Sequence, residues 1–367
     1  MDKTYFFILE SLRCYINALP PPSCDGIDLR ALFKISKRQE VCGIIYSMQQ
    51  SQFDFGQEKN NFAQVFAQTI QLTTRQAIAF KQFSDFCETN NIPYAPIKGA
   101  VIKSLYPNPQ LRLMGDMDIL IRPADLARCQ EFMAENNYKF LELNDCVYEF
   151  ANGAIMFELH LQLLDHNKPI FDNYLIENNQ LDVTQHFIFL ISHLRKHIIS
   201  SGVGIRVIFD IALFERAHNL RPSDCADALA RIGACEFAAV IQNYIDKWFF
   251  SAPIAEQTFD KDELDLLEYI FQSDNFGFEN RSPGVALSAR RSSGAKALAI
   301  AIFPSKHTMY NLFPRLAQHK YLLPWYYIVR IFSKLKNRKY YAKVAKDALT
   351  NDGEAQRIRE IHKKLGI

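Results

Sequence analysis

Two short segments alternate apolar and polar side chains, at residues 111–121 (LRLMGDMDILI) and 154–163 (AIMFELHLQL). Side chains along a β-strand point to opposite faces with a period of two, so each segment predicts a strand with one apolar face. The opposite face carries Asp116 and Asp118 in the first segment and Glu158 in the second. If the strands are neighbours, three carboxylates converge, and they repel one another unless a cation lies between them. The pattern therefore predicts a divalent-metal site.

The residues before the first acidic segment predict a place for a phosphate. An apolar run at residues 92–97 predicts a strand, and Lys98 and Gly99 follow it, ahead of a helix-compatible stretch at residues 100–105. A glycine at a helix start lets a phosphate approach the backbone N–H groups, and a lysine adds positive charge. Lys98 and Gly99 are therefore candidates for binding a triphosphate. An ordinary turn between a strand and a helix is the alternative.

The order of these motifs resembles the nucleotidyltransferase superfamily built on the polymerase-β catalytic fold. It looks most like a bacterial group of nucleotidyltransferases with a Lys-Gly turn, an Asp-x-Asp pair and a Glu-Leu-His motif. The residues that carry the likeness are Lys98, Gly99, Leu105, Tyr106, Pro107, Arg112, Asp116, Asp118, Glu158, Leu159 and His160. The resemblance implies an α+β fold, in which helical regions flank a small mixed β-sheet. It also implies transfer of a nucleoside monophosphate from a nucleoside triphosphate to an acceptor.

The resemblance gives the three acids their expected roles. Asp116, Asp118 and Glu158 would be the catalytic residues and would bind Mg²⁺ or Mn²⁺. Glu158 would complete the metal site or accept the proton of the attacking hydroxyl. The alternatives are a solvent-exposed strand face for the two aspartates and a surface position on an edge strand for Glu158.

Two further residues are expected to bind substrate phosphate. Arg112 lies on the predicted face of the aspartates, where it could clamp a phosphate or form a salt bridge with those aspartates. His160 shares the predicted face of Glu158, and orienting that glutamate is its alternative role. The acceptor of the nucleotidyl group stays open among a small molecule, a sugar, a protein and an RNA end.

Two differences from the better-known superfamily members leave a second function open. Those members carry Gly-Ser or Gly-Gly where this chain has Lys98 and Gly99, and their third acid is usually an aspartate rather than Glu158. The alternative is a catalytically silent module that binds a nucleotide or a partner. Such a module could be peripheral to a membrane system that makes polysaccharide or modifies peptides.

The pattern along the chain predicts three regions. Residues 1–90 are expected to be helical, with a long amphipathic helix at residues 62–87. Residues 91–180 would form the nucleotidyltransferase-like α/β unit. Residues 181–367 would be a second helical region that ends in a basic tail.

The second helical region contains two pairs of polar residues one helical turn apart. His193 and His197 have a spacing that can bind a metal, but a packing or hydrogen-bonding role is favoured because no glutamate follows the first histidine. Arg206 and Asp210 are expected to form a local ion pair. The family likeness makes this second pair a further candidate for lining the cleft.

Charge is unevenly distributed along the chain. From residue 281 onward there are 18 lysines and arginines against four acids, whereas the rest has 24 basic and 36 acidic residues. Residues 321–341 combine aromatic and basic side chains. This pattern suits weak contact with an anionic membrane or a nucleic acid. Packing of the aromatic face inside the protein, with a solvated basic edge, is the commoner arrangement.

The cysteines and the apolar segments indicate the cellular compartment in which the protein is expected. The eight cysteines show no Cys-x-x-Cys pair, which favours reduced thiols over a disulfide framework or a zinc site. No signal peptide is evident, and no stretch of about 18 uncharged apolar residues predicts a transmembrane helix. A cytoplasmic location is therefore expected.

Overall fold

The computed structural model describes most of the chain up to residue 273 and parts of the remainder. The described residues are 2–51, 53–144, 146–165, 168–171, 173–200, 202–273, 306, 309, 316, 319–336 and 352–367. The chain divides into two units. The first combines Met1–His197 with Gly202–Gly277, and the second combines Ile198–Ser201 with Phe278–Ile367.

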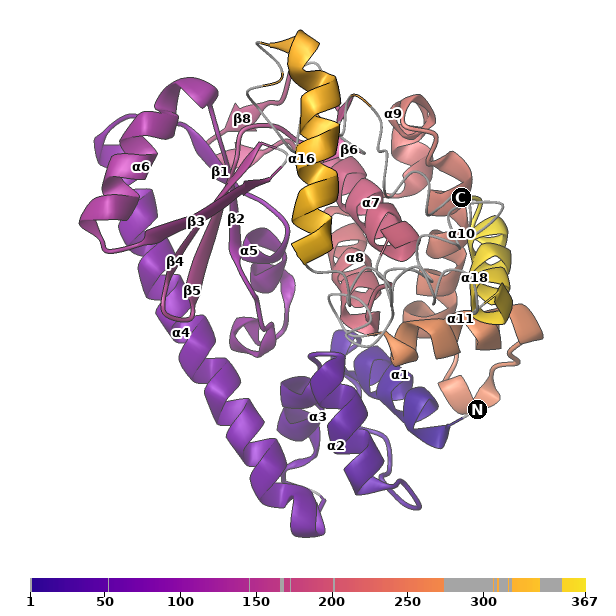
Figure 1. Cartoon of the computed structure of the whole chain (residues 1–367). Helices are drawn as coiled ribbons and strands as arrows, with labels where there is room; N and C mark the ends of the chain where they lie inside the picture. Colours follow the sequence, from indigo (N-terminus) through magenta and orange to yellow (C-terminus); the bar gives the residue numbers. More distant parts are fainter. Residues whose placement is uncertain are drawn as a thin grey trace. The chain divides into compact units, whose positions relative to one another are not determined.

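The first unit contains a five-stranded mixed β-sheet (Figure 1). The strand order is β1-β2-β5-β4-β3. The strands are β1 (Tyr94–Pro96), β2 (Met117–Ile121), β3 (Lys139–Asn144), β4 (Val147–Asn152) and β5 (Ile155–His160). The central pair, β2 and β5, is parallel, and the other neighbours are antiparallel. Two small hairpins follow: β6 (Leu164–Asp165) with β7 (Lys168–Pro169), and β8 (Ile176–Glu177) with β9 (Gln180–Leu181).

Apolar side chains cover both faces of β2. Met117, Ile119 and Ile121 lie in one core cluster with residues of α4 (Lys59–Thr89) and α6 (Leu126–Glu135). Leu120 points to the other face and packs with Phe189 of α7 (Val183–Ser200). The period of two therefore separates a wholly apolar face from one that carries Asp118. Figure 1 shows α4 and α6 on the same side of the sheet.

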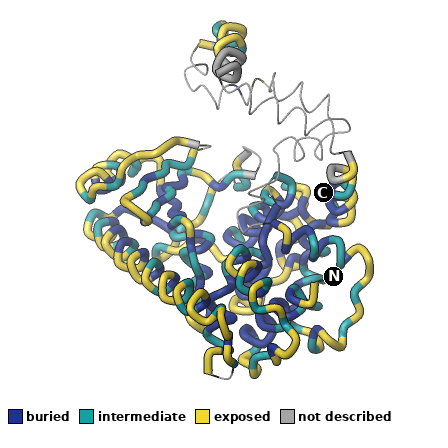
Figure 2. Tube along the Cα trace, turned by 60° about the horizontal axis from the view of Figure 1, so that its bottom comes forward, coloured by how far each residue is buried: buried dark blue, intermediate teal, exposed yellow. Residues whose placement is uncertain are grey.

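Helices make up the rest of the first unit. Three precede α4: α1 (Lys3–Ile16), α2 (Leu29–Arg38) and α3 (Cys42–Gln49). Aspartate side chains cap the first two, because Asp2 and Asp28 accept hydrogen bonds from backbone N–H groups of the first turn. The later helices are α8 (Ile205–His218), α9 (Ala226–Arg231), α10 (Cys235–Ile245) and α11 (Lys261–Gln272). Figure 2 shows exposed residues along the outer side of these elements and buried residues inside.

Short helical turns connect the main elements. The four-residue helix α5 (Gly99–Ile102) follows β1 after two intervening residues, and a five-residue π-helix (Asp246–Phe250) extends α10. The 3₁₀ turns are η1 (Gly56–Glu58), η2 (Lys103–Leu105), η3 (Pro109–Leu111), η4 (Pro123–Asp125), η5 (Pro222–Cys225) and η7 (Ile254–Glu256).

The described part of the second unit contains two longer helices. They are α16 (Leu323–Lys336), which follows the turn η8 (Lys320–Leu322), and α18 (Asp352–Lys364). The expected aromatic and basic segment thus begins as a helix, with Tyr321 and Trp325 exposed, and its residues 337–341 lie outside the described residues. No helix in the described ranges is both long and apolar enough to cross a lipid bilayer.

Most of the expected elements are confirmed, with one correction at the first acidic segment. A mixed sheet flanked by helices, the long helix before it and the strand that carries Glu158 are all present. The expected strand at residues 111–121, however, begins only at Met117. Pro109 starts a 3₁₀ turn that Asn108 caps, and this turn ends at Leu111. Arg112 and Met114 therefore do not share a strand face with the aspartates.

Candidate active site

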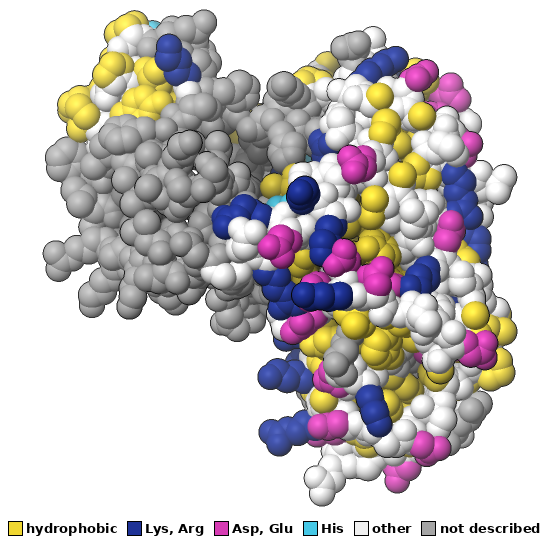
Figure 3. All heavy atoms as spheres, turned by 90° about the vertical axis from the view of Figure 1, so that its right-hand side faces the viewer, with side chains coloured by type: hydrophobic (Ala, Val, Ile, Leu, Met, Phe, Trp, Pro, Cys, Tyr) yellow, Lys and Arg dark blue, Asp and Glu magenta, His cyan; other side chains and the backbone are white. Residues whose placement is uncertain are grey.

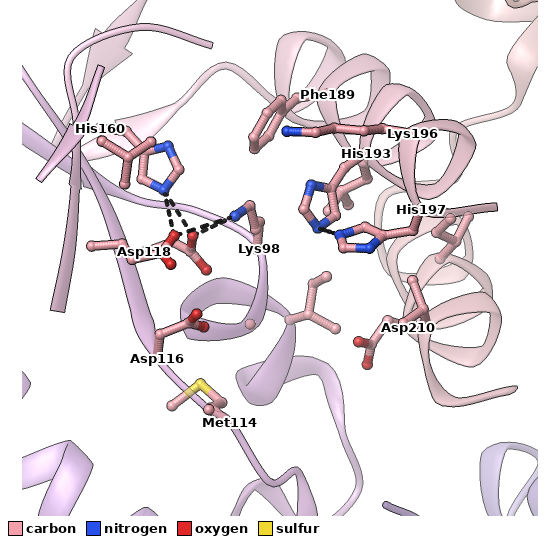
Figure 4. Close-up of a pocket in the computed structure, with 18 of the residues that line it drawn as sticks. Lys98, Met114, Asp116, Asp118, His160, Phe189, His193, Lys196, His197 and Asp210 are labelled. Carbon is pink, nitrogen blue, oxygen red and sulfur yellow. Dashed lines mark hydrogen bonds and ion pairs between the residues drawn. The ribbon is translucent and has the colours of Figure 1, made fainter. Parts of the chain in front are cut away.

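A cavity of about 380 Å³ lies in the first unit and brings the candidate residues together. Lys98, β2 and β5 line its sheet side, and residues of α7 and α8 line its helix side. All seven residues proposed from the sequence line this cavity: Lys98, Gly99, Arg112, Asp116, Asp118, Glu158 and His160. Figure 4 shows Lys98 between the carboxylates of the sheet side and the histidines of the helix side.

The parallel pairing of β2 and β5 brings the three acids together. Asp118 is the register partner of Glu158, and Asp116 immediately precedes β2. We call Asp116, Asp118 and Glu158 the acidic cluster. Burial, followed by the charges of Asp118 and Glu158, raises the pKa of Asp116 well above its usual range. Ionisation of all three carboxyl groups at once is therefore unfavourable unless further positive charge lies beside them.

His160 connects two members of the acidic cluster. Its Nε2 lies 2.8 Å from Asp118 Oδ1 and 3.3 Å from Glu158 Oε2. Burial and the Lys98 ammonium lower the pKa of His160, but hydrogen bonds with the two carboxylates outweigh them and raise it overall. The expected position of His160 on the face of Glu158 is confirmed, and its imidazole orients both acids.

Lys98 reaches the same carboxylates from the turn after β1. Its Nζ lies 2.5 Å from Asp118 Oδ1 and 3.8 Å from Glu158 Oε2. Although burial raises the pKa of Asp118, the Lys98 ammonium and then His160 hold it far below its usual range. The Lys98 backbone has a φ of 48° and a ψ of −124°, a conformation that residues other than glycine rarely adopt. Its N–H donates to His186 Nε2 at 2.9 Å.

Gly99 makes room for an arginine side chain. A Cβ added at this position would overlap the Arg112 guanidinium. The guanidinium therefore packs directly on the Gly99 backbone, where only a glycine leaves enough space. This contact explains why a glycine follows Lys98, which the sequence pattern alone does not explain.

Arg112 binds a carboxylate of α8 and not the aspartates of the acidic cluster. Its Nε lies 3.1 Å from Asp210 Oδ1, and its Nη2 lies 2.7 Å from Asp210 Oδ2. Tyr106 donates its hydroxyl to Asp210 Oδ1 at 2.6 Å. Arg206 forms the expected ion pair with Asp210 at 3.2 Å, and it also contacts Glu40 at 3.0 Å. This network anchors the turn at Gly99 to α8.

Five residues of α7 line the helix side: Phe189, Leu190, His193, Lys196 and His197. The expected hydrogen-bonding role of the histidines is confirmed, because their Nε2 atoms lie 3.0 Å apart. Burial and the nearby Lys98 charge lower the pKa of both, to about 4 for His197. Phe189 and Lys196 were not proposed from the sequence. Phe189 lies four residues before His193, and Lys196 lies three residues after it, which is the spacing that predicts a shared helix face.

The donor atoms fit a divalent cation. One ligand atom from each of Asp118, Glu158 and His160 lies within 4.8 Å of the others, and Asp116 adds a fourth candidate. Carboxylate oxygens are the preferred ligands of Mg²⁺ and Mn²⁺, and imidazole is tolerated better by Mn²⁺. The acidic cluster and His160 would therefore hold such an ion.

Comparison with known proteins agrees with this chemistry. A family described as "Uncharacterised nucleotidyltransferase" matches residues 25–249, which include the whole five-stranded sheet, α7 and α8. No curated protein and no solved structure gives a significant match. The family match covers more than half of the chain and includes every residue that lines the cavity. The chain therefore belongs to the uncharacterised nucleotidyltransferase family.

Proposed function

We propose that this protein is a metal-dependent nucleotidyltransferase with a catalytic unit of polymerase-β type. It moves a nucleoside monophosphate from a nucleoside triphosphate to an acceptor hydroxyl or phosphate and releases pyrophosphate. The observation that carries this proposal is that Asp118 and Glu158, paired across two parallel strands, line one cavity with Asp116, which precedes the first of these strands. Family membership supports the triphosphate as substrate.

The acidic cluster and His160 would hold Mg²⁺ or Mn²⁺ in this site. When bound, the metal ion supplies charge neutralisation to the reacting phosphate. Asp118 is held by His160, whose Nε2 contacts its Oδ1. A carboxylate held in this way needs little rearrangement during the reaction, which is how pre-organised sites lower a barrier.

Glu158 is the residue best placed to take up the proton of the acceptor. Its carboxylate lines the cavity and is half-buried, and His160 orients it through Oε2. A glutamate in this position can accept the proton of an attacking hydroxyl. Arg112 and Lys98 would assist by contacting phosphate oxygens, since both side chains line the same cavity.

The helix side of the cavity would select the acceptor. In this proposal residues 91–180 form the catalytic unit, while residues 1–90 and 181–367 surround it with helices. On the face shown in Figure 3, acidic and basic side chains are interspersed. This mixture favours a substrate held inside the cavity over an extended nucleic-acid surface on that face.

A thermal-shift measurement tests the proposal. A ligand that binds only the folded state raises the melting temperature. We expect a nucleoside triphosphate with Mn²⁺ to raise the melting temperature of the wild type and to have almost no effect on Asp118→Asn. The control is Asp85→Asn, because Asp85 is exposed on α4 and pairs only locally with Lys81. An equal shift in Asp118→Asn and the wild type would refute the assignment of this site.

A further inference from the structure

The Lys98 ammonium contacts the carboxylate oxygens that would bind the metal. Its Nζ lies 2.5 Å from Asp118 Oδ1, and it is 3.8 Å from Glu158 Oε2. The Lys98 side chain is only 17% exposed, so solvent screens these contacts weakly. Asp118 Oδ1 is thus paired with a positive charge that belongs to the protein itself.

A metal ion at the same carboxylates would compete with this ammonium. Mg²⁺ binds carboxylate oxygens at about 2.1 Å. A metal and an ammonium that share Asp118 Oδ1 would therefore lie within a few ångströms of each other, and two cations at such a separation repel strongly in a shielded site. Full binding of the metal requires that the ammonium move to another partner.

The backbone keeps the base of the Lys98 side chain in place. Its N–H donates to His186 Nε2, and α5 begins at the next residue. The unusual φ of 48° persists because the Ile97 N–H donates to the Asp118 carbonyl oxygen on one side and α5 begins on the other. Since the main chain is fixed, the ammonium can leave Asp118 only by rotation of its own side chain, which stays inside the cavity. After such a rotation, the ammonium would contact an anionic ligand bound in that cavity.

We propose that Lys98 is an internal competitor for the metal, so the site takes up a metal–triphosphate complex in preference to a free metal ion. Without nucleotide the ammonium neutralises Asp118 and Glu158. A bound triphosphate offers phosphate oxygens to the ammonium, and the carboxylates are then released to the metal. The inference rests on the proposed function, because it places the triphosphate in this cavity.

The first experiment measures free Mn²⁺ by electron paramagnetic resonance while the protein is titrated without nucleotide. We expect Lys98→Met to bind Mn²⁺ roughly tenfold more tightly than the wild type, because the competing charge is gone. Lys98→Gly should show the same gain in Mn²⁺ affinity. Because glycine adopts a positive φ without strain, this variant is expected to fold even if Lys98→Met does not. The control is Lys103→Met, because the Lys103 ammonium contacts the carbonyl oxygen of Thr73 and no carboxylate of the acidic cluster.

The second experiment measures binding of a non-hydrolysable ATP analogue by calorimetry in the presence of a chelator. Here we expect Lys98→Met to bind roughly tenfold more weakly than the wild type, because a charge-assisted contact with phosphate is lost. The two effects have opposite signs, whereas a general loss of structure would weaken both kinds of binding. Unchanged or weaker Mn²⁺ binding by both Lys98 variants would overturn the inference.

The two experiments also separate this inference from the proposed function. If the wild type binds the analogue and Lys98→Met gains no affinity for Mn²⁺, the competition is refuted and the nucleotidyltransferase proposal stands. If neither protein binds the analogue or its guanosine, cytidine and uridine counterparts, with or without Mn²⁺, the proposed function is refuted. In that case the preference for a metal–triphosphate complex is also refuted, regardless of the Mn²⁺ affinities measured in the first experiment.

Discussion

Asp118 receives the shortest contacts that Lys98 and His160 make with the acidic cluster. It is almost completely buried, and its Oδ1 accepts hydrogen bonds from Lys98 and from His160. Burial of an unpaired carboxylate is strongly unfavourable, and the contacts with Lys98 and His160 offset this cost. The same two contacts fix the direction in which Asp118 faces the cavity.

Gly99 allows a residue-scale prediction about stability. We expect Gly99→Ala to lower the free energy of unfolding by about 2–4 kcal/mol, because the new Cβ would displace the Arg112 guanidinium from its buried pair with Asp210. Urea denaturation measures this change. The matched variant is Gly43→Ala in α3, whose Cβ would meet only Leu111 Cδ2 at 3.6 Å. Gly43→Ala should be neutral or slightly stabilising, and equal losses in both variants would contradict the packing argument.

At the scale of elements, the sequence predicted the strands better than the connections. The alternation of side chains located β5 closely and placed Glu158 and His160 on one face. It also extended β2 too far, because residues 112–116 continue the apolar and polar alternation although the 3₁₀ turn at Pro109 precedes them. Periodicity describes a strand only where neighbouring strands supply hydrogen bonds, and the single sequence does not show where that pairing begins.

The site was predictable where it depends on neighbouring strands and not where it depends on distant helices. The approach of Asp118 to Glu158 follows from two strand patterns. The partner of Arg112 could not be predicted, because Asp210 lies 98 residues later in α8. The position of α7 opposite the acidic cluster likewise depends on tertiary packing, in which Phe189 joins Leu120 and Ile97. The division into three regions stays a prediction.

At the scale of the whole molecule, a buried acid of α8 makes stability depend on pH. Burial raises the pKa of Glu215 to about 8. A carboxyl group whose pKa is higher in the folded state stabilises the fold while it is protonated in both states, below its usual pKa of 4.5. This contribution is lost as the pH rises through about 8, because the unfolded chain can then release a proton that the folded protein retains.

Glu215→Gln should remove that dependence. We expect the stability of the variant relative to the wild type to increase between about pH 5 and about pH 9, by on the order of a few kcal/mol. Chemical denaturation across this range measures the difference. Glu236→Gln, at an exposed position of α10, is the control and should give a nearly constant difference. A constant difference for Glu215→Gln as well would show that this carboxyl group titrates normally.

The central claim is that Glu158 joins the two aspartates around one cation, and a pair of glutamates tests it most directly. Glu149 of β4 is the register partner of Glu158 on the side away from β2, and it also lines the cavity. The measurement is Mn²⁺ affinity in the presence of a non-hydrolysable ATP analogue. We predict that Mn²⁺ affinity falls at least about tenfold in Glu158→Gln and less than about threefold in Glu149→Gln. The first substitution removes a metal ligand, whereas the second removes only a more distant negative charge. Equal affinities in Glu158→Gln and the wild type would contradict the account.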